Sequence, residues 1–249
     1  ENFIIMNNML AKTKLFFAVL VAATLLVISS ADKAMCQNLQ TAQLGNETNS
    51  TYSYPINTFY NYSVCEMIFT ADELSSEGIY AGSTISSISF NYFYSTTLTK
   101  ENQEIYIANT TKSNFTSESD FVLAGAMTQV YSGTITYTNE NGNWVSIEFN
   151  SPFIYMGGNI IVAVVNNDGS YLNSYHTFYY SNVSDNLTIT TENDSYPYNL
   201  STGTNSINNN MYGYYNTVRP NVRFEYENTN CDMINLTVSD ITKTSAQLY

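Results

Sequence analysis

The stretch ISSISFNYFY, residues 85–94, decides the fold class, because apolar and polar side chains alternate along much of it. Successive side chains of a β-strand point to opposite faces, so Ile88, Phe90 and Tyr92 fall on one face of an extended chain. Aromatic and β-branched residues also suit a pleated, half-buried surface. The stretch therefore predicts a strand with one face in a core.

Working outward, the same pattern recurs in short runs with turn signals between them. We expect strands at 59–69, 104–108, 129–131, 134–138, 144–149, 159–165, 177–180, 187–190 and 218–226. Strands at intervals of about ten residues are typical of a sandwich or barrel. The prediction is an all-β chain: an antiparallel β-sandwich, jelly-roll-like. Its common interior should hold Ile88, Phe90, Ile105, Ile107, Ile147 and Ile161.

Turn residues and one apolar run refine this prediction. Ser132-Gly133 and Asn141-Gly142 are expected to form turns, the second being the best hairpin signal in the chain. The run NIIVAVV, residues 159–165, is nearly all apolar and predicts a central strand covered on both faces. Thr70 with Glu73 predicts a capping box on a short helix.

Composition and charge narrow the class of partner. The chain has 22 tyrosines, only 12% charged residues and a formal net charge of -13. Binding of nucleic acid requires clustered Lys and Arg, which this chain lacks. Nucleic acid and anionic membrane surfaces are therefore poor partners, and a neutral ligand or a cation fits better.

The N-terminus carries an export signal. Lys12 and Lys14 precede the apolar run 15–28. Ala34 and Cys36 then give the small-x-small pattern of a cleavage site between Cys36 and Gln37. These 14 apolar residues would span only about 21 Å as a helix, less than the hydrocarbon core of a bilayer. We expect a cleavable signal helix, no membrane insertion after cleavage, and a secreted or outer-surface location. An uncleaved anchor and lipidation of Cys36 are the alternatives.

Several phrases, in this order, resemble one protein family. They are GSTISSISFNYFY (82–94), EIYIANTTKSNFTSESDFV (104–122), VYSGTITY (130–137), NWVSIEFNSPFIYMGGNIIVAVVNNDGSY (143–171) and VRPNVRFEY (218–226). Together they resemble the β-sandwich domain of large secreted surface proteins of the Bacteroidota. The resemblance implies fibronectin type III repeats after this domain and a C-terminal signal for type IX secretion, but no particular ligand.

The tail CDMINLTVSDITKTSAQLY, residues 231–249, resembles the opening of a fibronectin type III domain, with Ile234 where the family usually has Pro. Nineteen residues cannot bury a core of their own, so we expect a truncated start of such a domain. The predicted organisation is an untrimmed start plus signal peptide (1–36), an irregular lead-in (37–56), the sandwich (57–226), and a linker with the truncated domain (227–249).

Catalytic chemistry has little support in the sequence. His176 is the single histidine, so it would have to serve any Ser-His-Asp or Cys-His arrangement, and no accompanying signature is present. Three-histidine and Cys/His zinc sites are excluded by count, because Cys36 leaves with the signal and only Cys65, Cys231 and His176 remain. Cys65 and Cys231 either form a disulfide or lie buried separately. We expect no enzyme activity in this chain.

Binding chemistry concentrates in the polar segment 181–215. Tyrosine offers a flat apolar face and a hydroxyl, which suit stacking on a sugar ring or contact with a polypeptide. The candidate ligand-binding residues are Tyr196, Tyr198, Tyr212, Tyr214 and Tyr215, although loop tyrosines can also fold back onto the sandwich. Calcium is the one plausible metal, with oxygen ligands expected from Asn166, Asn167 and Asp168; a plain turn explains that sequence equally well.

These features predict a non-catalytic binding or adhesion module of a larger modular surface protein, with a glycan or an extracellular protein as its ligand. Two alternatives stay open. The sandwich could be a structural spacer, or an accessory domain of a secreted protease or glycoside hydrolase whose catalytic part lies beyond residue 249.

Overall fold

The computed structural model describes residues 39–139, 143–172, 174, 176–205, 211–228, 238–239 and 247–248. Residues Leu39–Asn230 form one compact unit. Its elements are β1 (Gln40–Leu44), β2 (Asn49–Thr51), β3 (Tyr62–Phe69), α2 (Ala71–Ser76), β4 (Thr84–Phe93), β5 (Leu98–Thr110), the 3-10 turn η1 (Ala124–Ala126), β6 (Thr128–Tyr137), β7 (Trp144–Ile154), β8 (Asn159–Asn166), β9 (Thr177–Asn182), β10 (Thr188–Asn193), β11 (Tyr198–Asn199), β12 (Thr204–Asn205), β13 (Tyr214–Asn216), β14 (Val218–Pro220) and β15 (Val222–Glu227).

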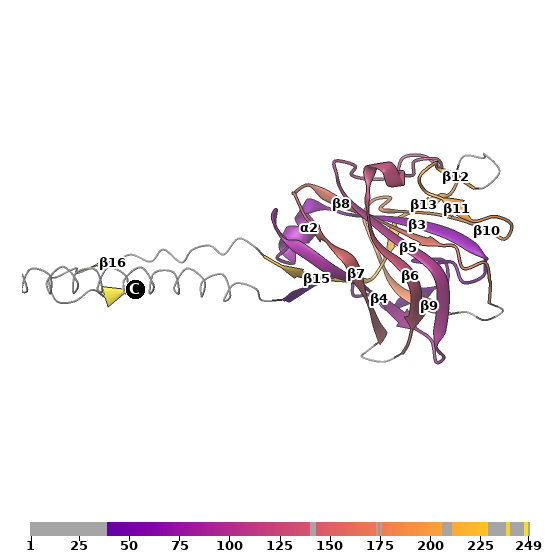
Figure 1. The fold of residues 1–249 in the computed structure, drawn as a ribbon, viewed down its shortest axis with the longest axis horizontal. Coiled ribbons are helices and arrows are strands. Elements are labelled where there is room, and N and C mark those ends of the chain that lie inside the picture. The colour runs from indigo at the N-terminus through magenta and orange to yellow at the C-terminus, as the bar shows by residue number, and fades with distance from the viewer. Residues whose placement is uncertain are drawn as a thin grey trace, which may run out of the picture. The chain divides into compact units, whose positions relative to one another are not determined.

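The unit is an antiparallel β-sandwich, which confirms the predicted fold class. One sheet has seven strands in the order β1-β15-β4-β9-β14, with β2 beside β9 and β7 beside β4. The other has six strands in the order β13-β10-β3-β8-β5-β6, whose central members run side by side in Figure 1. Successive strands repeatedly cross from one sheet to the other, as in a jelly roll.

The main core lies between the two sheets, and it contains the predicted alternating residues. Ile88, Phe90 and Tyr92 from β4 are fully buried there, as are Ile105 and Ile107 from β5. The two sheets interlock through aromatic rings, since Phe69 of β3 meets Phe224 of β15 edge to face with ring centroids 5.1 Å apart. Period-two burial is therefore confirmed on both sheets.

The strand β8 is covered on both faces, as its apolar run predicts. Val162 and Val164 point into the main core. Ile161 points away from it and packs with Phe115 on the outer face of the six-stranded sheet. The expectation that Ile161 would join the common interior was therefore wrong, because an unbroken apolar run does not reveal which of its residues face which layer.

The segment 111–127 covers that outer face. Phe115 is fully buried against it. Backbone hydrogen bonds fix the segment at both ends, from Phe115 N to Asn186 O at 2.8 Å and from Ala124 N to Leu200 O at 3.0 Å. A loop thus acts as a third, partial layer.

The lead-in is more regular than expected. Strand β1 pairs with β15, and β2 pairs with β9, so both belong to the sandwich. Their sequences QTAQL and NST are polar because each strand has at most one buried face. Burial patterns with so few apolar residues give little sequence signal for a strand.

One turn prediction and one hairpin prediction were wrong, although Asn141 and Gly142 themselves lie outside the described residues. Strand β6 runs straight through Ser132-Gly133, and the irregularity falls on its partner β5, where the register shifts between Lys100 and Gln103. The strands before and after Asn141-Gly142 do not pair, because β6 pairs with β5 and β7 pairs with β4 in the other sheet. An Asn-Gly pair marks a turn, but burial decides which strands then meet.

The short helix α2 has the predicted capping box, with Thr70 and Glu73 hydrogen-bonded reciprocally. Glu73 also receives two hydrogen bonds from Arg219, at 2.7 and 3.0 Å. Arg219 is buried, and its guanidinium lies over the ring of Phe69. This arrangement ties the helix to β14 and has a structural role.

In the part of the chain that the structure describes, no helix is long and apolar enough to cross a membrane. The residues expected to form the signal, including Cys36 and Gln37, lie outside the described ranges. Of the expected fibronectin type III start, only β16 (Val238–Ser239) and β17 (Gln247–Leu248) are described, and they pair antiparallel.

Candidate functional site

A hollow of about 300 Å³ lies beside β13, the edge strand of the six-stranded sheet. It is lined by tyrosines, two acids and a glycine: Tyr60, Glu118, Thr191, Glu192, Tyr212, Gly213 and Tyr214. Tyr212 and Tyr214 were predicted from the sequence, and the structure brings them to one site. We call this group the tyrosine–glutamate hollow.

The two predicted tyrosines are held by their backbone rather than by their rings. Tyr214 pairs with Thr190 in the β10–β13 ladder. The hydroxyl of Thr191 donates to the carbonyl oxygen of Tyr212 at 2.7 Å, and Gly213 N donates to the carbonyl oxygen of Glu118 at 2.7 Å. The rings are 63% and 67% exposed, so they project from a fixed edge into solvent.

Gly213 permits the close approach that shapes this edge. A Cβ atom there would lie 2.1 Å from the carbonyl oxygen of Thr190 and 2.8 Å from the ring of Phe121. No side chain fits in that space, so any larger residue would push β13 away from β10.

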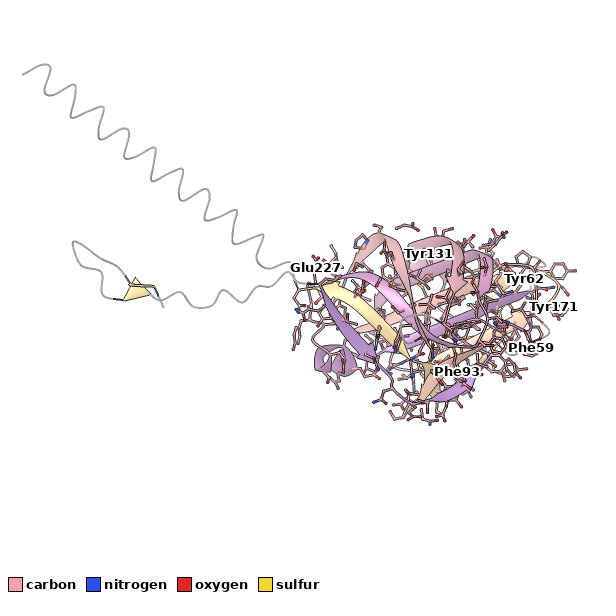
Figure 2. All side chains as sticks on the ribbon, turned by 90° about the horizontal axis from the view of Figure 1, so that it is seen from below. Phe59, Tyr62, Phe93, Tyr131, Tyr171 and Glu227 are labelled. Carbon is pink, nitrogen blue, oxygen red and sulfur yellow. The ribbon has the colours of Figure 1, made fainter. Side chains whose placement is uncertain are left out.

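Tyr60 reaches the hollow from the segment that precedes β3. Its neighbour Asn61 anchors this segment, because its backbone N–H and its side-chain amide donate to Oδ1 and to the carbonyl oxygen of Asp194, at 3.1 and 2.8 Å. Figure 2 shows Phe59 and Tyr62, which flank this segment, at the end of the domain away from Glu227. The hollow therefore collects residues from three distant parts of the sequence.

The carboxyl group of Glu192 gives the hollow its electrostatic character. The side chain is half-buried, and among the described residues it makes no ion pair and accepts no hydrogen bond. Burial raises the pKa of Glu192, because a carboxylate loses hydration there. Glu118 adds a second, exposed acid, and no basic side chain lines the hollow.

The other three predicted tyrosines lie elsewhere. Tyr198 is buried in a small core cluster, with its hydroxyl 2.9 Å from Thr191 Oγ1. Tyr215 is exposed, but neighbours on a strand point to opposite faces, so it leaves the face that Tyr214 occupies. Tyr196 is also exposed and does not line the hollow.

Sequence reasoning missed Tyr60, Glu118 and Glu192. Each belongs to a different segment, and no local motif links them. The one signal for Glu192 was its place within the polar segment 181–215, next to the last residue of β10.

The oxygens proposed for calcium have partners within the chain. Asp168 pairs with the buried ammonium of Lys100 at 3.0 Å and accepts from Glu101 N at 2.6 Å. Asn166 Oδ1 accepts from Gln103 Nε2 at 2.6 Å, and the side chain of Asn167 exchanges two hydrogen bonds with the backbone of Tyr198. Calcium binding there stays a prediction.

His176 and Cys65 occupy structural positions. His176 is buried beside Tyr92, whose hydroxyl lies 2.5 Å from Nδ1, and burial lowers the pKa of the imidazole. Cys65 is buried and unbridged, and Cys231 lies outside the described residues. Within the described residues no cluster of three or more His, Cys, Asp or Glu could hold a metal ion.

A larger hollow of about 420 Å³ is lined by Phe93, Tyr94, Ser95, Asn139, Asn143 and Thr177. Its lining contains no ionisable acid or base, and the hydroxyl of Thr177 already donates to the carbonyl oxygen of Phe93. The tyrosine–glutamate hollow is smaller, but it combines exposed rings with an unpaired carboxyl group, so it is the stronger candidate.

No protein-family model matches the chain, and no curated protein matches it. One distant likeness is to the cysteine protease and lectin-like domains of Cwp84, a surface layer associated protein of Clostridium difficile: 13% identity over 68% of this chain and 32% of that chain, with a TM-score of 0.38. Another is to the clostridial cysteine protease Cwp84 after propeptide cleavage, with 12% identity over 76% of this chain and 40% of that chain and a TM-score of 0.40. This chain thus matches well under half the length of either structure, and similarities this low assign neither a family nor a function.

Proposed function

We propose that residues 39–228 are a non-catalytic binding module of an exported surface protein and that the tyrosine–glutamate hollow binds a glycan. The carrying observation is the exposure of Tyr212 and Tyr214 on an edge whose backbone is fixed by hydrogen bonds. Tyrosine rings lose little conformational entropy on binding, and a fixed backbone lowers that cost further. Flat rings beside carboxylate acceptors suit the apolar faces and the hydroxyls of a sugar.

The position of the hollow supports the same function. Tyr60 belongs to the segment at the end of the domain opposite to Glu227, where β15 ends. If the module is attached to a larger protein through the Glu227 end, the hollow lies on the opposite side of the domain, open to ligands.

The test is a glycan array with the full chain, followed by titration of the best ligand against Tyr212→Ala and Tyr214→Ala. Loss of one stacking ring should weaken binding by about 10-fold, since about 1.4 kcal/mol corresponds to a factor of ten. Tyr171→Ala is the matched control, because Tyr171 is 55% exposed and lies outside the hollow. Equal losses in all three variants, or no glycan bound by the wild-type chain, would refute the proposal.

A further inference from the structure

Resting on the proposed function, we infer that the glycan bound by the tyrosine–glutamate hollow is cationic: an amino sugar polymer whose amino groups are free rather than acetylated. The inference concerns ligand charge, which glycan binding by itself leaves open. It rests on which partially buried carboxylates of the domain have a basic side chain or a hydrogen-bond donor beside them.

Three other half-buried acids of the domain have a basic partner. Glu73 pairs with Arg219 at 2.7 Å, Asp168 with Lys100 at 3.0 Å, and Asp120 with Lys112 at 2.5 Å. Partial burial of a carboxylate is costly unless a charge or hydrogen bonds compensate it, so these pairs are what folding is expected to produce.

Glu104 and Glu225 lack a base but accept hydrogen bonds from the hydroxyls of Tyr106 and Ser87. Glu192 has neither kind of partner. Among the described residues no base, hydroxyl or N–H compensates its carboxylate, although the side chain is half-buried in the wall of a hollow. A ligand ammonium placed there would supply the missing charge and recover the desolvation cost already present in the free protein. A neutral sugar would bury the carboxylate further without that gain.

The other lining residues favour a cation as well. Tyr60, Tyr212 and Tyr214 offer ring faces that attract ammonium groups, and Glu118 adds a second negative charge. The chain carries a net charge of -13, so its field draws cations toward every exposed acidic site. A basic side chain in the lining would have argued for an anion, and none is present among its residues.

A sugar fits better than a basic polypeptide. A peptide would bind this edge most simply by adding a strand to β13, but β13 has only three residues. The side-chain amide of Asn216 also donates to the carbonyl oxygen of Tyr214 at 3.2 Å, which occupies an acceptor on that strand. A hollow of about 300 Å³ is instead of the size that holds one or two hexose units.

Three oligosaccharides of equal length separate charge from sugar shape: the hexamers of glucosamine, of N-acetylglucosamine and of β-1,4-linked glucose. They are titrated calorimetrically into the full chain at about pH 6 and low salt. We expect the glucosamine hexamer to bind at least about 10-fold more tightly than the other two, with a preference that falls as salt rises.

Glu192→Gln should abolish this preference, because it removes the charge that favours the glucosamine hexamer over the two neutral hexamers. Glu148→Gln is the control, because Glu148 is an exposed acid on β7 outside the hollow and should leave the preference intact. Equal affinity for all three hexamers would overturn the cationic inference and leave glycan binding standing. No affinity for any glycan, here or on the array, would overturn both, and tighter binding of a lysine hexapeptide would replace the sugar with a polypeptide.

Discussion

Replacing Glu66 with glutamine should remove a strong pH dependence from the stability of the domain. Glu66 lies fully buried on β3, where its two carboxyl oxygens accept from Val122 N at 2.9 and 3.2 Å. Burial raises its pKa from 4.5 to about 8, although the Val122 N–H and the charge of Lys112 partly oppose the rise. The group is therefore protonated in the folded chain at neutral pH and ionised in the unfolded chain.

The sign and size of the effect follow from this difference. Below pH 4.5 both states hold the proton, and the full stability is present. As the pH rises toward 8, only the unfolded state releases the proton, so the free energy of unfolding falls. Each pKa unit corresponds to about 1.4 kcal/mol, which gives a loss of about 5 kcal/mol across the window.

The assay is urea unfolding of the full chain, followed by the fluorescence of Trp144, at several pH values between 5 and about 9. Glutamine keeps an oxygen for the Val122 N–H and cannot ionise, so the stability of Glu66→Gln minus that of the wild type should grow steadily with pH. The exposed control Glu148→Gln should differ from the wild type by a constant amount. Parallel curves for Glu66→Gln and the wild type would refute the reasoning.

Two further predictions test the ion pair between Lys100 of β5 and Asp168, which follows β8, and the edge of the hollow. Lys100→Met should lower the free energy of unfolding, measured with urea, by about 3–5 kcal/mol, because it leaves the Asp168 carboxylate buried without its cation. The double variant Lys100→Met with Asp168→Asn should recover part of that loss. If the double variant is no more stable than Lys100→Met, the pair is not the cause. Gly213→Ala should displace β13 from Thr190 and weaken glycan binding by about 10-fold in calorimetry. Gly125→Ala is the control, because a Cβ there would meet nothing within 4 Å, and it should bind glycan as the wild type does. Equal affinities of the two variants would contradict the prediction.

Much of the fold could be predicted because alternation reports burial on one face. Ile88 and Ile105 lie in the core for this reason. Around Ile161 both faces of the strand are buried, and in β1 most side chains are at least partly exposed. In both cases the alternation of apolar and polar residues is weak and does not report which side chains face the core. The predicted pairing of the strands on either side of Asn141-Gly142 was wrong for a related reason. Which strands pair depends on how both sheets are built from the whole chain, and a local turn signal does not report this.

The candidate site could be predicted only in part. Exposure of Tyr212 and Tyr214 followed from their polar surroundings, but the same surroundings suggested that Tyr198 was exposed, and its ring packs into a small cluster under β3. Glu192 joined the site through the β10–β13 pairing, which no local sequence pattern encodes. Composition identified the chemistry of the segment, and topology selected the residues that share a surface.

The pairing of β1 with β15 has a mechanical consequence. Gln40 lies opposite Tyr226 and Leu44 opposite Val222, so the chain enters and leaves the domain side by side. Because the two strands are antiparallel, tension that pulls Gln40 and Tyr226 apart would load the hydrogen-bonded pairs of this ladder one after another, beginning at that end. The sheet that carries the hollow contains neither strand, so the ladder loaded first is not the one that holds Tyr214 beside Thr190.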